Sequence, residues 1–446
     1  MLDNTKKVVL KLDNGLTCLI LPTNSILTEI SINIAYGYAN EQPKEVELAH
    51  YTEHLFARFL SKKYSNRQAL QNELRSRGAV SNASVDLYET RYFIKGLYDD
   101  VEFYMDILSN AMKELKIEKD IMKQEKNAVS QELRIQMSDS KWKFDQKIWN
   151  FMYKKYAYQM DKNEHIKSLK NYDITRIQNF VRKNYLLQNT TIIVNCPLNS
   201  IEKTKELLIQ YFSIPNKCPN CFVKTPVFSY KHKKLQIVHI PNKVQIDSIL
   251  VRQYVSKNIK FMSDEHISLL YIQDILFNFE KGIFFKKLRD EYGLIYSMSL
   301  NLNIDMKNPK SSLYFMETSV RDDKMQTLVY HLLEIISKID VSKTNIENTR
   351  NRFKLEKEMQ KFNNLTTFNK FYGKYFMNKT LIIERSDIYE KMLNIPHNII
   401  QKYVEIFKKD MLKGNLFYYS KYSFNKQIKQ KIGDNYDFLS IYNRYD

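Results

Sequence analysis

The chain has 446 residues, more than one domain normally contains, so we expect two domains of roughly 200 residues each. Its 43% hydrophobic and 27% charged residues are typical of a globular protein, and no apolar run approaches the roughly 18 residues that a membrane-spanning helix needs. The formal net charge of +19 could attract nucleic acid, but the lysines are spread over both halves and no RNA-recognition, zinc-finger or arginine-rich signature is present. We therefore expect no membrane span, no nucleic-acid partner and a weak preference for acidic partners.

At the start of the chain, "MLDNTKKVVLKLDNGLTCLILPTN", we expect no export signal, because Lys11 and Asp13 interrupt what would be its apolar core. The four cysteines are Cys18, Cys196, Cys218 and Cys221. The last two form a CPNC pair that could be a redox motif or half of a zinc site, but its Pro-, Asn- and Lys-rich surroundings favour a plain linker with free thiols. Free thiols suit a reducing compartment, so we expect a cytoplasmic location.

The first half of the chain begins with strand-like alternation in "KVVLKLD", "LTCLILP" and "EISINIAYGYA". The helical and strand-like patterns that follow are, in order, helix at 45–61, helix at 66–77, strand at 79–85, strand in "YETRYFIKG", helix at 98–114 and helix at 118–138. A strand in "TTIIVNCP" and a helix in "SIEKTKELLIQYF" close this half. These patterns predict a sheet covered by helices.

The second half repeats this order, with strands in "KKLQIVHIPNKVQIDSILVRQYVS", a helix near 262–277, a strand in "SSLYFMETSV" and long helices from 322 to 408. We therefore predict an α+β fold of two similar α/β-sandwich domains, each an antiparallel-rich sheet packed by helices, related by duplication. The predicted boundaries are a first domain at 1–212, a linker at 213–232 that includes CPNC, and a second domain at 233–446.

The segment "ELAHYTEHLFARFL" places His50, Glu53 and His54 within five positions. On a helix, His50 and His54 lie one turn apart on one face, where they can hold one ion, and Glu53 stays on that side. Two imidazoles and one carboxylate suit zinc with an open fourth position, and a neighbouring carboxylate can take a proton from the attacking water. This is the H-x-x-E-H order, although a charged helix face with core-contacting histidines would give the same spacing.

A further ligand must come from elsewhere in the chain. The segment "QEKNAVSQELRIQ" places Glu125 and Glu132 two turns apart on one helix face, with Val129 between them. One glutamate could bind the metal while the other accepts a hydrogen bond from a ligating histidine. Two solvated glutamates on a helix surface would show the same spacing.

"LAHYTEHLF", followed by Glu132 in "EKNAVSQE", resembles the inverzincin zinc peptidases of the pitrilysin and mitochondrial-processing-peptidase family. "VVLKLDNGLTCLILP" and "RGAVSNASVDLYETRYFIKG" resemble the family's opening hairpin and its Gly-Asn-Ala strand pair. The resemblance covers nearly all of both halves. It implies that His50, His54 and Glu132 bind one Zn²⁺ per chain, that Glu53 is the general base, and that Glu125 is the supporting acidic residue.

Two further features follow from the resemblance. "FFKKLRDEYGLIYSMS" is similar to the family segment whose Arg and Tyr, here Arg289 and Tyr296, hold the substrate backbone near the scissile bond. Both are sensible donors toward a carbonyl oxygen that gains charge. The strand with Ser81, Asn82, Ala83 and Ser84 is similar to the family's edge strand, to which an extended peptide adds by backbone pairing.

The resemblance implies a zinc metalloendopeptidase that cleaves short or unfolded peptides inside a dimeric chamber, of which this chain forms half of the clamshell. Because the zinc motif and the Arg/Tyr pair are both present, we favour a homodimer over a heterodimer with a homologous subunit. Trimming the leader of a ribosomally made secreted peptide is one expected use. The competing interpretations are a non-catalytic scaffold or partner subunit of the same fold, and a basic nucleic-acid-binding protein.

Overall fold

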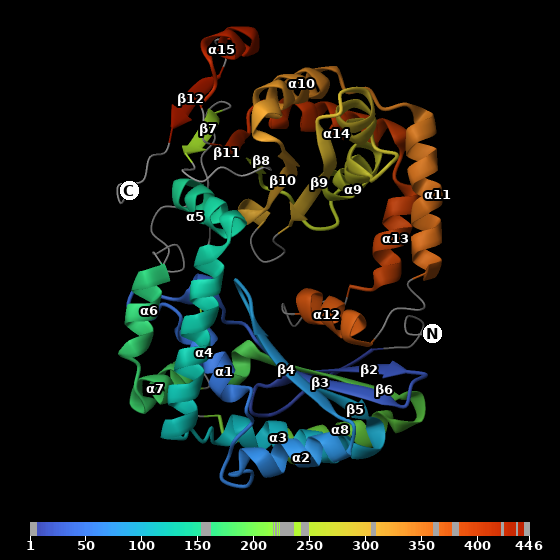
Figure 1. Ribbon diagram of the computed structural model, residues 1–446. Coiled ribbons are helices and arrows are strands. Elements are labelled where there is room, and N and C mark those ends of the chain that lie inside the picture. The colour runs from blue at the N-terminus through green and yellow to red at the C-terminus, as the bar shows by residue number, and fades with distance from the viewer. Residues whose placement is uncertain are drawn as a thin grey trace. The chain divides into compact units, whose positions relative to one another are not determined.

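The computed structural model describes residues 7–152, 162–216, 218, 221, 223, 236–241, 249–304, 309–359, 365–376, 383–420, 423–433 and 436–440 (Figure 1). The chain forms two compact units. Unit 1 comprises Met1–Asp139, Lys155–Pro226 and Met359–Glu384. Unit 2 comprises Ser140–Lys154, Val227–Glu358 and Arg385–Asp446.

Unit 1 contains a six-stranded sheet in the order β1-β2-β6-β3-β5-β4. Its strands are β1 (Val8–Lys11), β2 (Thr17–Thr23), β3 (Leu27–Ile34), β4 (Val80–Val85), β5 (Thr90–Leu97) and β6 (Thr190–Pro197). Neighbouring strands are antiparallel except β2 and β6, which run parallel. This order leaves β4 at one edge of the sheet.

Helices cover both faces of the unit 1 sheet. The helices of this unit are α1 (Leu48–Phe56), α2 (Arg67–Ser76), α3 (Val101–Lys113), α4 (Lys119–Ser138), α6 (Lys162–Lys170), α7 (Ile174–Asn184), α8 (Ile201–Phe212) and α12 (Leu365–Phe376). Because side chains alternate along a strand, Cys18 and Ile20 join the main core, whereas Leu19 and Leu21 pack against α12 on the other face. Figure 1 shows α12 on one side of the sheet and α3 and α8 on the other. The all-buried pattern of β2 follows from this double cover.

Unit 2 repeats this arrangement, with the strand order β12-β7-β11-β8-β10-β9. Its strands are β7 (Gln236–Pro241), β8 (Ile249–Ser256), β9 (Ile295–Asn303), β10 (Leu313–Val320), β11 (Asn415–Ser420) and β12 (Asp437–Ser440). Five of them, in the order β7-β11-β8-β10-β9, match β2-β6-β3-β5-β4 of unit 1 both in their order along the chain and in strand direction. The α+β fold with two similar domains is therefore confirmed.

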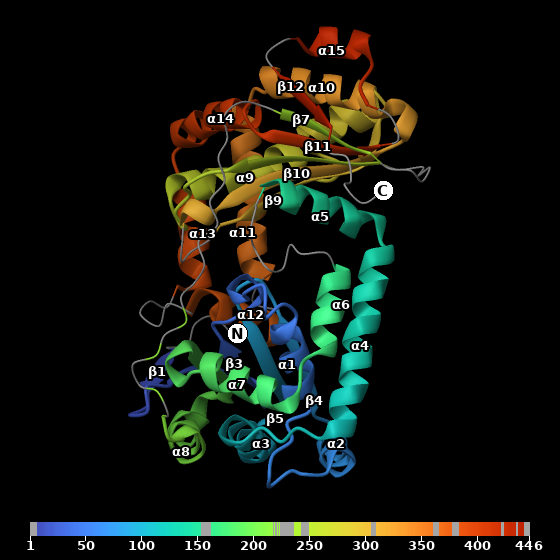
Figure 2. The ribbon, with the colours of Figure 1, turned by 90° about the vertical axis from the view of Figure 1, so that its left-hand side faces the viewer.

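The helices of unit 2 also lie on both faces of their sheet. They are α5 (Ser140–Met152), α9 (Asp264–Phe277), α10 (Met325–Lys338), α11 (Lys343–Met359), α13 (Arg385–Asn394), α14 (His397–Met411) and α15 (Lys426–Ile432). Leu416 and Tyr418 of β11 join the main core, whereas the Phe417 and Tyr419 rings contact those of Phe151 and Phe144 on α5. Figure 2 shows α5 and α10 on opposite faces of this sheet.

Each unit thus includes one helix from the other half of the chain. Helix α5 follows α4 of unit 1 along the chain, but it packs on the sheet of unit 2. Helix α12 lies between helices of unit 2 along the chain, but it packs on the sheet of unit 1. The predicted boundaries 1–212 and 233–446 are continuous segments and do not contain this exchange. The exchange supplies the second apolar layer that each buried sheet needs.

Only part of the predicted linker at 213–232 lies within the described residues. Cys218 and Cys221 are joined by a disulfide, with their Cα atoms 5.5 Å apart, whereas Cys18 and Cys196 are buried in the thiol form. This separation lies within the range that a disulfide spans, so the expectation of free thiols is wrong for the CPNC pair. Within the described ranges, no helix combines the length and apolar character that crossing a membrane requires.

Candidate metal centre

Helix α1 is shorter than the predicted helix at 45–61. It begins at Leu48 because Glu47 has a left-handed backbone (φ 66°), and the chain turns away after Phe56, where Phe59 also has a positive φ of 53°. The helix buries its apolar residues, among them Tyr51 and Leu55, in the core of unit 1. His50 and His54 project from one side of the helix, with their rings 4.9 Å apart.

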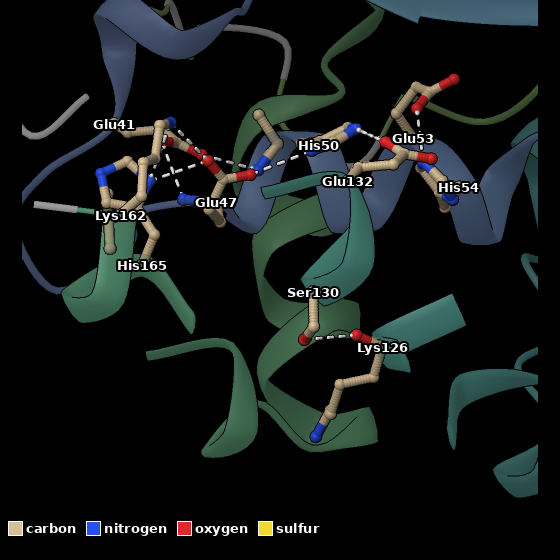
Figure 3. Close-up of polar contacts among 12 residues, drawn as sticks. Glu41, Glu47, His50, Glu53, His54, Lys126, Ser130, Glu132, Lys162 and His165 are labelled. Carbon is tan, nitrogen blue, oxygen red and sulfur yellow. Dashed lines mark hydrogen bonds and ion pairs between the residues drawn. The ribbon is translucent and has the colours of Figure 1, made fainter. Parts of the chain in front are cut away.

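Helix α4 carries the two glutamates that the sequence singles out. Val129, between them, is buried in the core, and the Tyr51 hydroxyl donates to the Met122 carbonyl at 2.7 Å, which fixes α4 against α1. The Glu132 carboxylate lies 3.3 Å from His50 Nε2 and 3.7 Å from His54 Nε2. The structure therefore brings His50, His54 and Glu132 together from two helices (Figure 3).

The second ring nitrogen of each histidine contacts a buried carboxylate. His50 Nδ1 lies 3.0 Å from Glu47 Oε2, and His54 Nδ1 lies 3.1 Å from Glu125 Oε2. Because an ionised carboxylate only accepts, each Nδ1 carries the proton in these contacts and each Nε2 presents a lone pair. Arg58 donates to Glu125 from Nε at 2.9 Å and also from Nη2.

These donors fit a zinc ion. Tetrahedral zinc with ligands at about 2.0–2.1 Å places neighbouring ligand atoms about 3.3 Å apart, close to the spacing of Glu132 from the two Nε2 atoms. The potential ligand atoms of His50, Glu53 and His54 also lie within 4.8 Å of one another. The Glu53 carboxylate lies 3.8 Å from His54 Nε2, about as far as the Glu132 carboxylate does. This geometry brings both carboxylates close enough to the histidines to serve as a ligand or as a neighbouring base.

The electrostatic surroundings separate the roles of the carboxyl groups. Burial raises the pKa of Glu53, and the neighbouring carboxylates add to this, although the two histidines partly oppose it. Burial would also raise the pKa of Glu125, but the hydrogen bonds from His54 and Arg58 lower it below the usual value. Burial would lower the pKa of His54, yet the contact with Glu125 and the nearby Glu53 and Glu132 raise it. Glu125 is therefore a fixed anion, whereas Glu53 is the carboxyl group that takes a proton more readily.

The predicted substrate strand borders the same cavity. This cavity has a volume of about 450 Å³ and is lined by Tyr38, His50, Glu53, His54, Ala57, Arg58, Asn82, Ala83, Ser84, Val85 and Glu132. Strand β4 pairs with β5 on one side, and as the last strand of the sheet it has no strand on its other side among the described residues. Ser81 is exposed on this strand but is not part of the lining.

A buried ionic cluster behind His50 was missed by the sequence reasoning. Glu47 is 1% exposed and contacts Lys162 Nζ at 3.0 Å and His165 Nδ1 at 2.7 Å, both from α6. Burial would raise the pKa of Glu47, but Lys162 and the two histidines hold it well below the usual value. Burial raises the pKa of Glu41, which receives hydrogen bonds from the backbone N–H groups of Glu47 and Ala49. Glu47 lies three positions before His50, and Lys162 three before His165, but only the fold brings these two pairs together.

Arg289 and Tyr296 belong to unit 2, whereas the other predicted site residues belong to unit 1. Arg289 lies in the π-helical turn Phe285–Glu291. Such turns are rare in proteins, and those that occur are often found at functional sites. Its guanidinium lies over the rings of Phe279, Phe285 and Tyr296, and Nη1 is 3.4 Å from the Tyr296 carbonyl. The Tyr296 side chain is largely exposed. The structure thus brings the exposed Tyr296 and the half-buried Arg289 together.

Comparisons with known proteins place the chain among zinc peptidases of one family. The family model "Insulinase (Peptidase family M16)" matches residues 23–166, and "Peptidase M16 inactive domain" matches residues 171–353. The chain is 21% identical to the zinc protease PqqE of Helicobacter pylori over 76% of each chain. It is 30% identical to Protease 3 of Escherichia coli over 29% of this chain and 14% of that protein. This alignment therefore covers only a small part of Protease 3.

The fold has solved counterparts. The periplasmic protease PqqL of Escherichia coli superposes with a TM-score of 0.73 at 16% identity, over 97% of this chain and 49% of that one. The chain therefore spans about half the length of PqqL. Because the two family models together match most of the chain, and the H-x-x-E-H residues converge as described, the chain belongs to the M16 family of metallopeptidases.

Proposed function

We propose that this protein is a zinc-dependent endopeptidase that cleaves short or unfolded peptides, with one zinc ion held per chain by His50, His54 and Glu132. The observation that carries the proposal is the convergence of these three side chains, with each histidine Nδ1 engaged by its own carboxylate. Such oriented donors are the usual construction of a catalytic zinc site. The family membership and the zinc protease among the relatives support the same conclusion.

When bound, zinc supplies Lewis-acid chemistry that polarises a peptide carbonyl and acidifies water. Glu53 then acts as the general base: its carboxylate accepts a proton as water attacks the carbonyl carbon and returns it to the leaving amine nitrogen. The raised pKa of Glu53, caused first by burial, suits this exchange because the group can both accept and release a proton. Glu125 and Arg58 keep His54 in place.

The peptide would bind as an additional strand along β4. The outer edge of β4 borders the cavity that contains His50, Glu53 and His54, and its residues there are the small or polar Asn82, Ala83 and Ser84. Backbone pairing gives affinity with little demand on the peptide sequence. We propose unfolded peptides as the substrate class, including the leader of a ribosomally made peptide, with a preference for acidic sequences that the formal net charge of +19 supports.

We further propose that the active form is a homodimer in which Arg289 and Tyr296 of one copy hold the substrate carbonyl near the zinc of the other. The chain spans half of PqqL, so two copies match the length of that protein. The zinc residues and the Arg/Tyr pair are both present in this one chain, which makes two identical copies sufficient. A heterodimer with a homologous subunit is the alternative, and the mass of the native complex distinguishes them.

The test of the proposed function compares Glu53→Gln with wild type. Both proteins are measured for zinc content and for cleavage of a mixed library of unfolded peptides. We expect about one zinc per chain in both, and a loss of turnover of about 10²- to 10⁴-fold in the variant, because only the proton acceptor is removed. Glu206→Gln, a change of the same kind at an exposed position on α8, is the control and is expected to match wild type.

Two outcomes would contradict the proposal. Full activity in Glu53→Gln would exclude Glu53 as the base. Zinc binding without cleavage of any peptide by wild type would instead favour a non-catalytic partner subunit of the same fold.

A further inference from the structure

Glu47 has an unusual backbone for a residue with a side chain. It lies directly before α1 in the left-handed region, with φ 66° and ψ 5°, a conformation that glycine adopts far more easily. Glu41 holds the backbone there, because its two carboxylate oxygens accept from the Glu47 N–H at 3.0 Å and the Ala49 N–H at 2.8 Å. A side chain retained at a strained position points to a role for that side chain.

The strained backbone directs the Glu47 carboxylate inward. One oxygen lies 3.0 Å from His50 Nδ1, and the other lies 3.0 Å from Lys162 Nζ and 2.7 Å from His165 Nδ1. Figure 3 shows Glu47 between His50 on one side and the Lys162 and His165 side chains on the other. Both oxygens are therefore used, one toward the helix with the candidate ligand and one toward α6.

The charges explain why α6 is needed. A buried carboxylate is strongly unfavourable unless cations and hydrogen bonds compensate it, and Glu47 is 1% exposed beside a second buried carboxyl group, Glu41. Lys162 supplies a cation at hydrogen-bond distance. The other histidine of the centre has a parallel arrangement, in which His54 contacts Glu125 and Arg58 supplies the cation.

We propose that Glu47 is the positioning residue of His50, and that Lys162 of α6 sets zinc affinity through it by holding the carboxylate in the place where it contacts His50 Nδ1. This inference rests on the proposed function, since it takes His50 as a zinc ligand. Glu47 does not touch the metal position itself; it fixes the orientation and tautomer of the imidazole and raises its basicity. Helix α6 is thereby part of the metal centre although it contributes no ligand.

The experiment measures the dissociation constant for zinc by competition with a chromophoric chelator, using full-length protein. Glu47→Gln keeps the shape and removes the charge, and Lys162→Met removes the cation that holds it. We expect zinc to dissociate about 10- to 100-fold more readily from both variants than from wild type. Lys162→Arg keeps the cation and is expected to retain most of the wild-type affinity.

The matched control is Glu45→Gln. Glu45 is two residues from Glu47 and its side chain is also mostly buried, but it pairs with Lys183 at 3.1 Å rather than with a histidine of the centre. Zinc affinity in this variant is expected to equal that of wild type. The melting temperature of each metal-free protein shows whether the variant folds, and Glu47→Asp, which keeps the charge but shortens the reach, serves if Glu47→Gln does not fold.

The outcomes separate this inference from the proposed function. Weakened zinc binding in Glu47→Gln and Lys162→Met, with wild-type binding in Glu45→Gln, supports the positioning role. A lower melting temperature with unchanged zinc affinity would overturn it, because Glu47 and Lys162 would then be structural only. Failure of wild type itself to bind zinc would overturn the proposed function, and this inference with it.

Discussion

Each histidine of the proposed centre is oriented through its Nδ1 atom. Nε2 faces Glu132, and Nδ1 faces a buried carboxylate whose charge is balanced by a cation. This construction leaves the imidazoles little freedom to turn, so a metal ion would meet ligands that are already oriented. At the scale of single residues, the remaining question is how the carbonyl of the substrate is held, and Arg289 is the candidate.

We expect Arg289→Lys to lower kcat/KM for peptide cleavage by about 10²-fold with zinc content unchanged. Lysine keeps the charge but loses the planar fork that contacts the rings of Phe279, Phe285 and Tyr296. Steady-state kinetics together with metal analysis measures both quantities. Lys286→Ala, an exposed change in the same π-helical turn, is the control, and equal kinetics in Arg289→Lys and wild type would exclude the role.

The sequence predicts the residues that obey a helical period. His50 and His54 are one helical turn apart, and Glu125 and Glu132 are two turns apart. The spacing alone therefore predicts that the members of each pair share one face of their helix. Glu47 and Lys162 obey no such period, because 115 positions separate them and their contact depends on how α6 packs. Charged residues are also normally solvated, so a buried carboxylate with its own cation has no signature in the sequence.

At the scale of elements, strand β4 combines an open edge with a wall of the cavity. The Ala83 N–H donates to the Asn82 side-chain oxygen at 2.8 Å rather than to β5, which places this N–H on the outer edge. An approaching peptide would take the place of the Asn82 side chain on this N–H. The sequence indicates the strand, but only the sheet order shows that it is an edge strand.

We expect Ala83→Pro to raise KM for peptide cleavage by about tenfold while kcat and zinc content change little, because proline lacks the N–H that a peptide would pair with. Proline is tolerated on the open side of an edge strand, so the sheet should form. Ala83→Ser keeps the N–H and serves as the control. An unchanged KM in the proline variant would show that peptides do not bind along β4.

Helix α12 is the second element whose role can be tested. Phe368, Tyr372 and Phe376 on it pack against Leu19, Leu21 and Ile193 of the unit 1 sheet, and Asn369 donates to the buried Glu29 carboxylate at 3.1 Å. This contact could not be predicted from sequence, since the apolar face of α12 fits a sheet of either half equally well. The continuous burial of β2 reflects this cover on both faces of the sheet.

We expect Phe368→Ala to reduce the free energy of unfolding of unit 1 by about 3–5 kcal/mol, because a fully buried ring is removed from a packed layer. Hydrogen–deuterium exchange measures this as lost protection in β2, β3 and β6, the strands that α12 covers. Lys370→Ala, an exposed change on the same helix, should alter protection very little. Equal protection in the Phe368 variant and wild type would show that α12 does not stabilise this sheet.

At the scale of the whole molecule, the two units are similar in strand order but carry different chemistry. The proposed zinc ligands lie in unit 1 and the Arg/Tyr pair lies in unit 2. The duplication itself is visible in the sequence as a repeated order of strands and helices. The exchange of α5 and α12 between the halves is not visible in the sequence. A repeated order of elements is most simply read as two continuous domains, one after the other.

The proposed homodimer predicts complementation between two inactive variants. Glu53→Gln and Arg289→Ala are each expected to be inactive alone. If Arg289 acts on the zinc site of the partner copy, co-expressed chains should regain about a quarter of wild-type activity, because half of the dimers are mixed and each mixed dimer has one complete site. The peptide-cleavage rate of the purified mixture measures this, and no recovery would place Arg289 and Glu53 in the same copy or exclude the dimer.

The most direct test of the metal centre is anomalous diffraction at the zinc edge from crystals of the zinc-loaded Glu53→Gln protein. We expect one peak per chain, about 2.0–2.1 Å from His50 Nε2 and His54 Nε2 and at bonding distance from a Glu132 oxygen. We also expect Glu47 and Glu125 to remain on the two Nδ1 atoms. A zinc ion bound at other residues, or no peak between α1 and α4, would contradict the proposed metal centre.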